Sequence, residues 1–138
     1  MATTDALHES WATLWESIAD AQPDSLAVVI GTQEMTWREY DERAARLAGA
    51  FIANDVGAGT KVAQLMFNCP EYMESVYAAF KVSASPVNVN YRYQAAEIAY
   101  VCDNAGAEVL VFHGAHSDRV AEACTQGLMP SVRLLLQV

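Results

Sequence analysis

Apolar and polar positions in the first part of the chain predict a helix, a hairpin and a second helix. Apolar residues at spacings of four, three and four form one face of an amphipathic helix: Leu7, Trp11, Leu14 and Ile18. An apolar strand over residues 26–30 and a short return over residues 35–37 predict a small hairpin. Thr36 and Glu39 match a capping box, which opens a second amphipathic helix that stops near residues 55–57.

From residue 61 onward, short apolar runs alternate with amphipathic helices. The expected strands are 62–67, 86–89, 108–112 and 133–138, and the helices between them are 70–83, 94–104 and 118–126. Three successive strand-helix-strand units predict an α/β fold with a parallel sheet of about four strands and helices on both faces. No internal linker or repeat divides the sequence, so residues 1–138 are expected to form a single compact unit.

The loops after the strands are where such a fold carries function, because ligands bind beyond the carboxyl ends of strands in an open parallel sheet. These loops follow Phe67, Val89 and Phe112. His113 and His116 in the third loop have no carboxylate or thiol at a companion spacing, so we expect solvated histidines and not metal ligands. The loops predict no catalytic residue and no metal site.

The second loop, residues 88–93, combines two amides, two phenols and a guanidinium. At a strand end, Arg92 suits bidentate pairing with a phosphate or a carboxylate. In the alternative interpretation, an Asn caps the turn, the tyrosines cover the sheet edge and Arg92 pairs with a neighbouring acid such as Glu97. The residues alone leave both open. Lys81 and Arg119 are expected to be solvated charges.

Charge and cysteine content narrow the class of protein. With 17 acidic and 8 basic side chains, the net charge of −9 argues against nucleic acid or an anionic membrane as partner. No apolar run approaches a membrane span and the start of the chain lacks a leader pattern, so a cytoplasmic location is expected. The three cysteines fit neither a disulfide framework nor a zinc site and are expected to be small buried residues: Cys69, Cys102 and Cys124.

The order of these pieces resembles the N-terminal portion of adenylate-forming (AMP-binding) acyl-CoA ligases over essentially the whole chain. Residues 36–40 resemble the family's first core motif, and residues 80–90 resemble the second, a Lys-Ala-Gly-Ala stretch leading into a strand. Val82 and Ser83 replace the Ala and Gly, which is expected to change packing more than function. Residues 88–93 look most like those of bacterial fatty-acid or steroid side-chain acyl-CoA ligases.

The resemblance implies an intact enzyme that uses ATP and magnesium to convert a carboxylic acid to an acyl-adenylate and then transfers the acyl group to CoA. In such enzymes the phosphate-binding loop and the catalytic lysine lie beyond the stretch that this chain resembles. We therefore expect an incomplete part of the large N-terminal domain, inactive alone and without a cofactor of its own. Arg92 sits where some relatives place an arginine near the CoA phosphates. The alternative is a non-catalytic interaction module that forms a homodimer or complements a partner chain.

Overall fold

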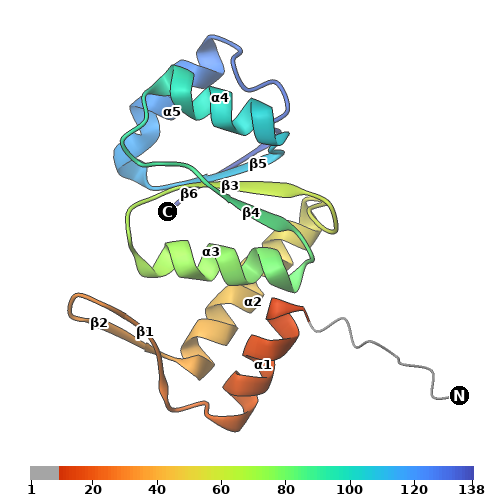
Figure 1. The fold of residues 1–138 in the computed structure, drawn as a ribbon, viewed down its shortest axis with the longest axis vertical. Coiled ribbons are helices and arrows are strands. Elements are labelled where there is room, and N and C mark those ends of the chain that lie inside the picture. Colours follow the sequence, from red (N-terminus) through yellow and green to blue (C-terminus); the bar gives the residue numbers. More distant parts are fainter. Residues whose placement is uncertain (1–9) are drawn as a thin grey trace, which may run out of the picture.

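The computed structural model describes residues 10–138, and its elements follow the predicted alternation (Figure 1). The helices are α1 (Trp11–Ala21), α2 (Trp37–Ala53), α3 (Pro70–Lys81), α4 (Ala95–Ala105) and α5 (Ser117–Thr125), with a 3-10 turn η1 (Gly114–His116) before α5. The strands are β1 (Leu26–Ile30), β2 (Gln33–Thr36), β3 (Lys61–Leu65), β4 (Ser85–Asn88), β5 (Val109–Phe112) and β6 (Leu134–Gln137).

The hairpin and the start of α2 form as the sequence predicts. β1 and β2 pair antiparallel, and the chain passes from β2 directly into α2. The hydroxyl of Thr36 accepts from the backbone N–H of Glu39 at 3.3 Å, while the Glu39 carboxylate accepts from the N–H of Thr36 at 2.8 Å. The capping box is therefore confirmed, and it satisfies backbone donors that the first turn of a helix leaves free.

The main sheet has four parallel strands in the order β4-β3-β5-β6. β3 therefore lies between its successor β4 on one side and β5 on the other. The predicted parallel sheet of about four strands is confirmed. The chain moves outward from β3 to β4 and then crosses to the opposite side, so the direction of the connections reverses between β3 and β5.

Alternate residues of β3 face opposite layers of helices, because side chains of a strand alternate between its two faces. Val62 and Met66 pack with α2 and α3, whereas Ala63 and Leu65 pack with α4 and α5. In Figure 1 the sheet separates α4 and α5 above from α3 and α2 below. The prediction of helices on both faces is therefore confirmed.

Helix α1 and the hairpin pack on the outer side of α2 and α3 and form a third apolar cluster. The Trp15 ring lies 5.1 Å from that of Tyr77 and 5.5 Å from that of Phe80, measured between centroids. Two residues of the apolar face predicted for this helix are exposed, Trp11 at 61% and Leu14 at 43%, whereas Ile18 is half-buried. The prediction is wrong for Trp11 and Leu14, because Trp15 with Ala12 and Ala19 forms the packed side of the helix. Leu7 lies outside the described residues.

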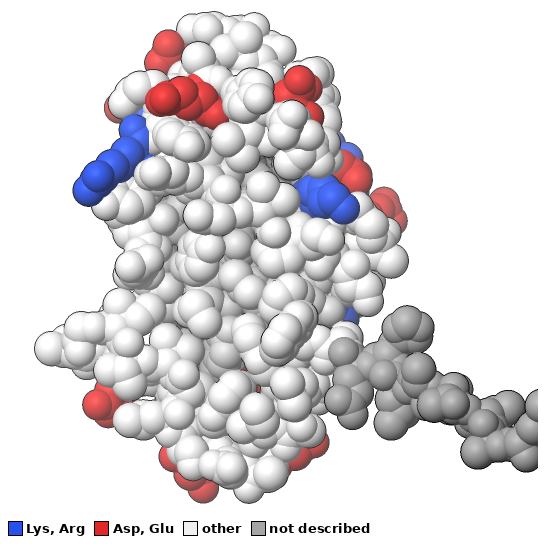
Figure 2. Space-filling view, viewed as in Figure 1, with Lys and Arg blue, Asp and Glu red and all other residues white. Residues whose placement is uncertain are grey.

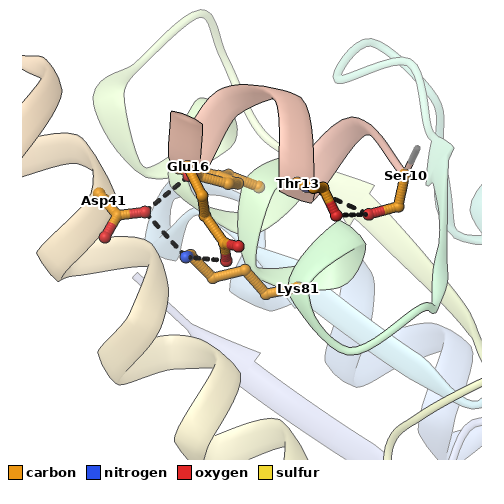
Figure 3. A network of polar contacts seen from close by, with 6 residues as sticks. Ser10, Thr13, Glu16, Asp41 and Lys81 are labelled. Atoms are coloured by element: carbon orange, nitrogen blue, oxygen red, sulfur yellow. Dashed lines mark hydrogen bonds and ion pairs between the residues drawn. The ribbon is translucent and has the colours of Figure 1, made fainter. Parts of the chain in front are cut away.

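Lys81 joins three helices in one polar network (Figure 3). Its Nζ lies 2.7 Å from a carboxylate oxygen of Glu16 on α1 and 2.8 Å from one of Asp41 on α2. The hydroxyl of Tyr77 donates to the same Asp41 oxygen at 2.6 Å. Burial alone would lower the pKa of Lys81, but the two carboxylates outweigh it and raise that pKa. The prediction of a solvated lysine is therefore wrong, since 11% of the side chain is exposed.

The cysteines differ in exposure more than predicted. Cys102 is buried, and burial raises the pKa of its thiol to about 11. Cys69 is half-buried, whereas Cys124 is exposed on α5, where the prediction of a buried residue is wrong. Within residues 10–138, no helix combines the length and the apolar character that crossing a bilayer requires.

Candidate functional site at the carboxyl ends of the strands

The reversal between β3 and β5 defines where a ligand site is expected. Open parallel sheets bind ligands in the crevice beyond the strand ends at the point where the strand order reverses. Three segments reach this edge: the residues after β3, the loop after β4 and the turn after β5. The sequence pattern predicted these loops but did not say which of them are neighbours.

Four rings from these three segments form an aromatic group, here called the edge cluster: Phe67, Tyr91, His113 and His116. The centroid of the Phe67 ring lies 5.1 Å from that of Tyr91, 5.3 Å from that of His113 and 4.6 Å from that of His116. Phe67 is thus the centre of the cluster. Sequence reasoning missed this role, although an aromatic residue at the end of the predicted strand 62–67 was the available signal.

His116 is buried within the edge cluster, with 2% of its surface exposed. A guanidinium N–H of Arg119 donates to its Nδ1. Because a guanidinium has no acceptor, Nδ1 must accept, and the neutral ring carries its proton on Nε2, which has no hydrogen-bond partner within residues 10–138. Burial lowers the pKa of His116, and the neighbouring Arg119 and His113 lower it further. The prediction of a solvated histidine is wrong here; His113 is half-buried.

Arg119 links the loop after β4 to α5 by hydrogen bonds. Its guanidinium donates to the backbone carbonyl of Tyr91 at 2.9 Å and to that of Tyr93 at 2.6 Å, as well as to His116. The prediction of a solvated charge is therefore wrong. The error arises because the partners are carbonyls 26 and 28 residues away, which a local pattern does not reveal.

Arg92 extends from the same loop, and its guanidinium has no ion pair among the residues that the structure describes. Its backbone N–H donates to the side-chain oxygen of Asn90 at 3.0 Å, which confirms the predicted turn-capping amide. The guanidinium carbon lies 5.5 Å from the centre of the Tyr91 ring. No acid within residues 10–138 forms an ion pair with the Arg92 guanidinium. The Glu97 carboxylate accepts instead from the backbone N–H of Gln94 at 2.9 Å. Pairing with Glu97 is the wrong interpretation.

A hollow of about 300 Å³ adjoins Tyr91 at this edge. Its lining consists of amides, phenols and two apolar residues: Met66, Asn68, Tyr72, Asn88, Val89, Asn90 and Tyr91. Amides and phenols can form hydrogen bonds with a ligand, and aromatic faces can stack against flat rings, so this lining suits the binding of a small molecule. Within residues 10–138, no group of three or more His, Cys, Asp or Glu side chains could hold a metal ion. A larger hollow of about 530 Å³ lies between the hairpin and helices α2 and α3.

An open parallel sheet with a binding edge at its reversal point places the protein among α/β ligand-binding folds. Residues 15–137 match the family model described as AMP-binding enzyme, and the chain belongs to that family. It is 35% identical over 127 residues to a medium/long-chain-fatty-acid–CoA/3-oxocholest-4-en-26-oate–CoA ligase of Mycobacterium marinum, an alignment that covers 92% of this chain and 23% of that protein. The 3-oxocholest-4-en-26-oate–CoA ligase of Rhodococcus rhodochrous is also 35% identical, with 22% of its length covered.

Solved structures agree with the fold. The inhibitor-bound N-terminal domain of FACL13 from Mycobacterium tuberculosis matches with a TM-score of 0.88 at 22% identity, covering 94% of this chain and 33% of that one. A fatty acyl CoA synthetase of Mycobacterium tuberculosis matches with a TM-score of 0.87 at 23% identity, covering 94% and 26% respectively. The chain thus spans about a quarter of the length of the curated relatives it matches.

Proposed function

We propose that this chain is the N-terminal part of an ATP-dependent ligase that joins a fatty acid or a steroid side-chain acid to CoA. Identity of 35% to a ligase whose name states both kinds of acid, and of 35% to a second ligase named for the steroid acid, supports the proposal. The ligase would use ATP and magnesium to form an acyl-adenylate and CoA to accept the acyl group, in the cytoplasm. Since the chain spans 23% of one relative, we propose that the remaining length supplies the catalytic groups and that this chain is inactive alone.

The observation that carries a ligand-binding role is the guanidinium of Arg92, which pairs with no acid in the described part of the chain, residues 10–138. Arg92 is exposed at the carboxyl edge of the sheet, beside the ring of Tyr91, a residue that lines the hollow. In a protein with a net charge of −9, a cation at a strand end without an acidic partner is suited to an anionic ligand group. We propose that it contacts a phosphate of CoA in the intact ligase.

The ligase proposal is tested by a chimera in which this chain replaces the matching segment of the Mycobacterium marinum ligase. We expect the chimera to release pyrophosphate from ATP and fatty acid and to form acyl-CoA, whereas this chain alone releases none above background, because adenylyl transfer needs charge-stabilising groups from the rest of the enzyme. A folded chimera that neither adenylates nor forms acyl-CoA contradicts the assignment. Pyrophosphate release by the chain alone contradicts its predicted inactivity.

The role of Arg92 is separated from folding by comparing two steps in the same chimera. Arg92→Ala is expected to raise the KM for CoA about fivefold, the loss expected of one exposed ionic contact. Adenylation, which precedes CoA binding, is expected to stay unchanged. Arg46→Ala, which removes another exposed arginine from α2, is the matched control and should alter neither step. Equal effects of both variants, or a loss of adenylation, would refute a CoA contact.

A second candidate function, an interaction module that pairs with another chain, is favoured by apolar surface. Trp11 and Leu14 are exposed on the outer face of α1. Figure 2 shows that charged residues on the viewed face lie mainly toward its two ends and leave the middle uncharged. Uncharged surface of this kind is typical of protein contacts. This candidate predicts self-association or binding to a partner chain.

A further inference from the structure

The loop after β4, residues 89–94, is exposed along most of its length but is tied down at both ends. At its start, the N–H of Val89 donates to a backbone carbonyl of β3 at 2.9 Å. At its end, the N–H of Gln94 donates to the Glu97 carboxylate of α4 at 2.9 Å. Arg92 lies between these two points, so the direction of its side chain depends on how the intervening peptide groups are held.

Both peptide groups that adjoin Arg92 have partners inside the loop. The N–H of Arg92 donates to the side-chain oxygen of Asn90 at 3.0 Å, and the N–H of Tyr93 donates to the backbone carbonyl of Asn90 at 3.0 Å. These bonds close a turn around Arg92. They do not attach the turn to another element, so the turn could still move as a unit against the sheet.

Arg119 supplies the attachment to another element. One of its guanidinium nitrogens donates to the carbonyl of Tyr91 at 2.9 Å and to that of Tyr93 at 2.6 Å. These carbonyls belong to the residues on either side of Arg92. The other terminal nitrogen donates to Nδ1 of His116, which is buried and therefore orients the guanidinium from a fixed point. A planar guanidinium serves several acceptors in a fixed geometry, which the single ammonium of a lysine does not provide.

The Tyr91 ring extends this attachment to the Arg92 side chain. The ring lies 5.1 Å from that of Phe67, the centre of the edge cluster, and 5.5 Å from the guanidinium carbon of Arg92. Arg92 thus lies beside a ring that is packed at the sheet edge, and the carbonyl of the same tyrosine is held by Arg119. Loss of Arg119 would free both the backbone around Arg92 and the ring beside it.

We propose that Arg119 is a positioning residue for CoA binding, which holds the loop after β4 so that Arg92 reaches a phosphate of CoA. This inference rests on the CoA contact proposed above for Arg92. A guanidinium that is already oriented loses less freedom when it binds, and a smaller loss of freedom increases affinity. Three hydrogen bonds to protein acceptors hold the Arg119 guanidinium, so it acts through the loop and does not itself touch CoA.

The first test is hydrogen exchange of this chain, measured at the amides of Arg92 and Tyr93. Both amides are hydrogen-bonded within the loop, so their exchange reports how often the loop opens. Arg119→Ala is expected to speed the exchange of both about tenfold or more, because the loop loses its bonds to α5. The amides of β3 and β5 are expected to stay protected in the same experiment, which shows that the variant is folded.

Arg133→Ala is the matched control, because Arg133 makes the same kind of attachment elsewhere. Its guanidinium donates to the carbonyls of Asn54 and Asp55 at 2.8 and 2.9 Å, in the turn after α2. It should leave the two loop amides unchanged. Arg119→Lys keeps the charge and the apolar stem, should speed loop exchange about threefold, and replaces Arg119→Ala if that variant does not fold. Unchanged loop exchange in the Arg119 variants, or equal acceleration by Arg133→Ala, overturns the proposal.

The second test measures the two steps of catalysis in the chimera with the Mycobacterium marinum ligase. Arg119→Ala is expected to raise the KM for CoA about fivefold, as Arg92→Ala does, while adenylation stays unchanged. A general loss of structure would impair both steps, so the difference between them separates positioning from stability. Arg133→Ala should alter neither step.

The double variant Arg92→Ala/Arg119→Ala should raise the KM for CoA no further than Arg92→Ala alone, since Arg119 acts through Arg92. Effects that multiply in the double variant would overturn the proposal, and so would a KM that rises in Arg92→Ala but not in Arg119→Ala. A KM that is unchanged in Arg92→Ala refutes the CoA contact itself. Loop exchange then shows separately whether Arg119 holds the loop.

Discussion

Ser83 has a backbone conformation that is unfavourable for residues other than glycine. It follows α3 with φ of 59°, in the left-handed region, and it donates its N–H to the carbonyl of Phe80 at 3.0 Å. The N–H of Ala84 donates to the carbonyl of Ala79 at 2.8 Å, which completes a Schellman motif. Glycine is the favoured residue here, and the family pattern places a Gly where this chain has Ser83. Ser83 therefore stands at a backbone position that favours glycine, and the expectation that the substitution changes packing more than function stays a prediction.

Ser83→Gly is expected to raise the free energy of unfolding by about 1 kcal/mol, because glycine enters the left-handed region without the steric penalty of a side chain. Urea denaturation followed by circular dichroism measures the change. Ser85→Gly, in the extended strand β4, is the matched control and should lower the stability by about 0.5–1 kcal/mol, since glycine weakens a strand. A loss of stability in Ser83→Gly would show that the hydroxyl, and not the backbone, decides this position.

At the scale of elements, α1 is attached to the molecule by aromatic packing and by the Lys81 network. The lysine belongs to α3, and its two carboxylate partners belong to α1 and α2. Its ammonium also lies 4.5 Å from the centre of the Tyr77 ring. A lysine that is largely buried, hydrogen-bonded and over an aromatic face stabilises more than an exposed ion pair does.

Lys81→Met is expected to lower the free energy of unfolding by about 2 kcal/mol, because it keeps the apolar stem but leaves Glu16 and Asp41 close together without a cation. The value comes from urea denaturation at constant ionic strength. Lys61→Met is the control: among residues 10–138 the Nζ of Lys61 reaches only the carbonyl of Gly59, at 3.5 Å, and a change below about 0.5 kcal/mol is expected. Similar effects of the two variants would mean that the network contributes little.

At the scale of the whole molecule, periodicity predicted the elements well and their contacts poorly. Every predicted helix and strand of the described part is present, because alternation and capping are local properties of the chain. The strand order could not be predicted from the sequence, because an apolar run such as residues 109–112 has the same pattern whichever strand it pairs with. The roles of Lys81, Arg119 and His116 were missed for a related reason: the partners that bury or hold them lie in other elements. The place of Arg92 in the loop after β4 was predicted because a position at a strand end is itself a local property; its role as a ligand contact stays a prediction.

The strand order also bears on how the chain folds as it is synthesised. Neighbouring strands of the sheet are always separated by at least one helix in the sequence, and β3 pairs with both β4 and the later β5. Pairings between distant segments are slow to form, because a long loop must close before any contact repays its entropy. On the ribosome, β3 and β4 emerge first and can pair while the opposite side of β3 stays vacant until β5 arrives. The sheet then grows outward from β3, and β6 joins after β5.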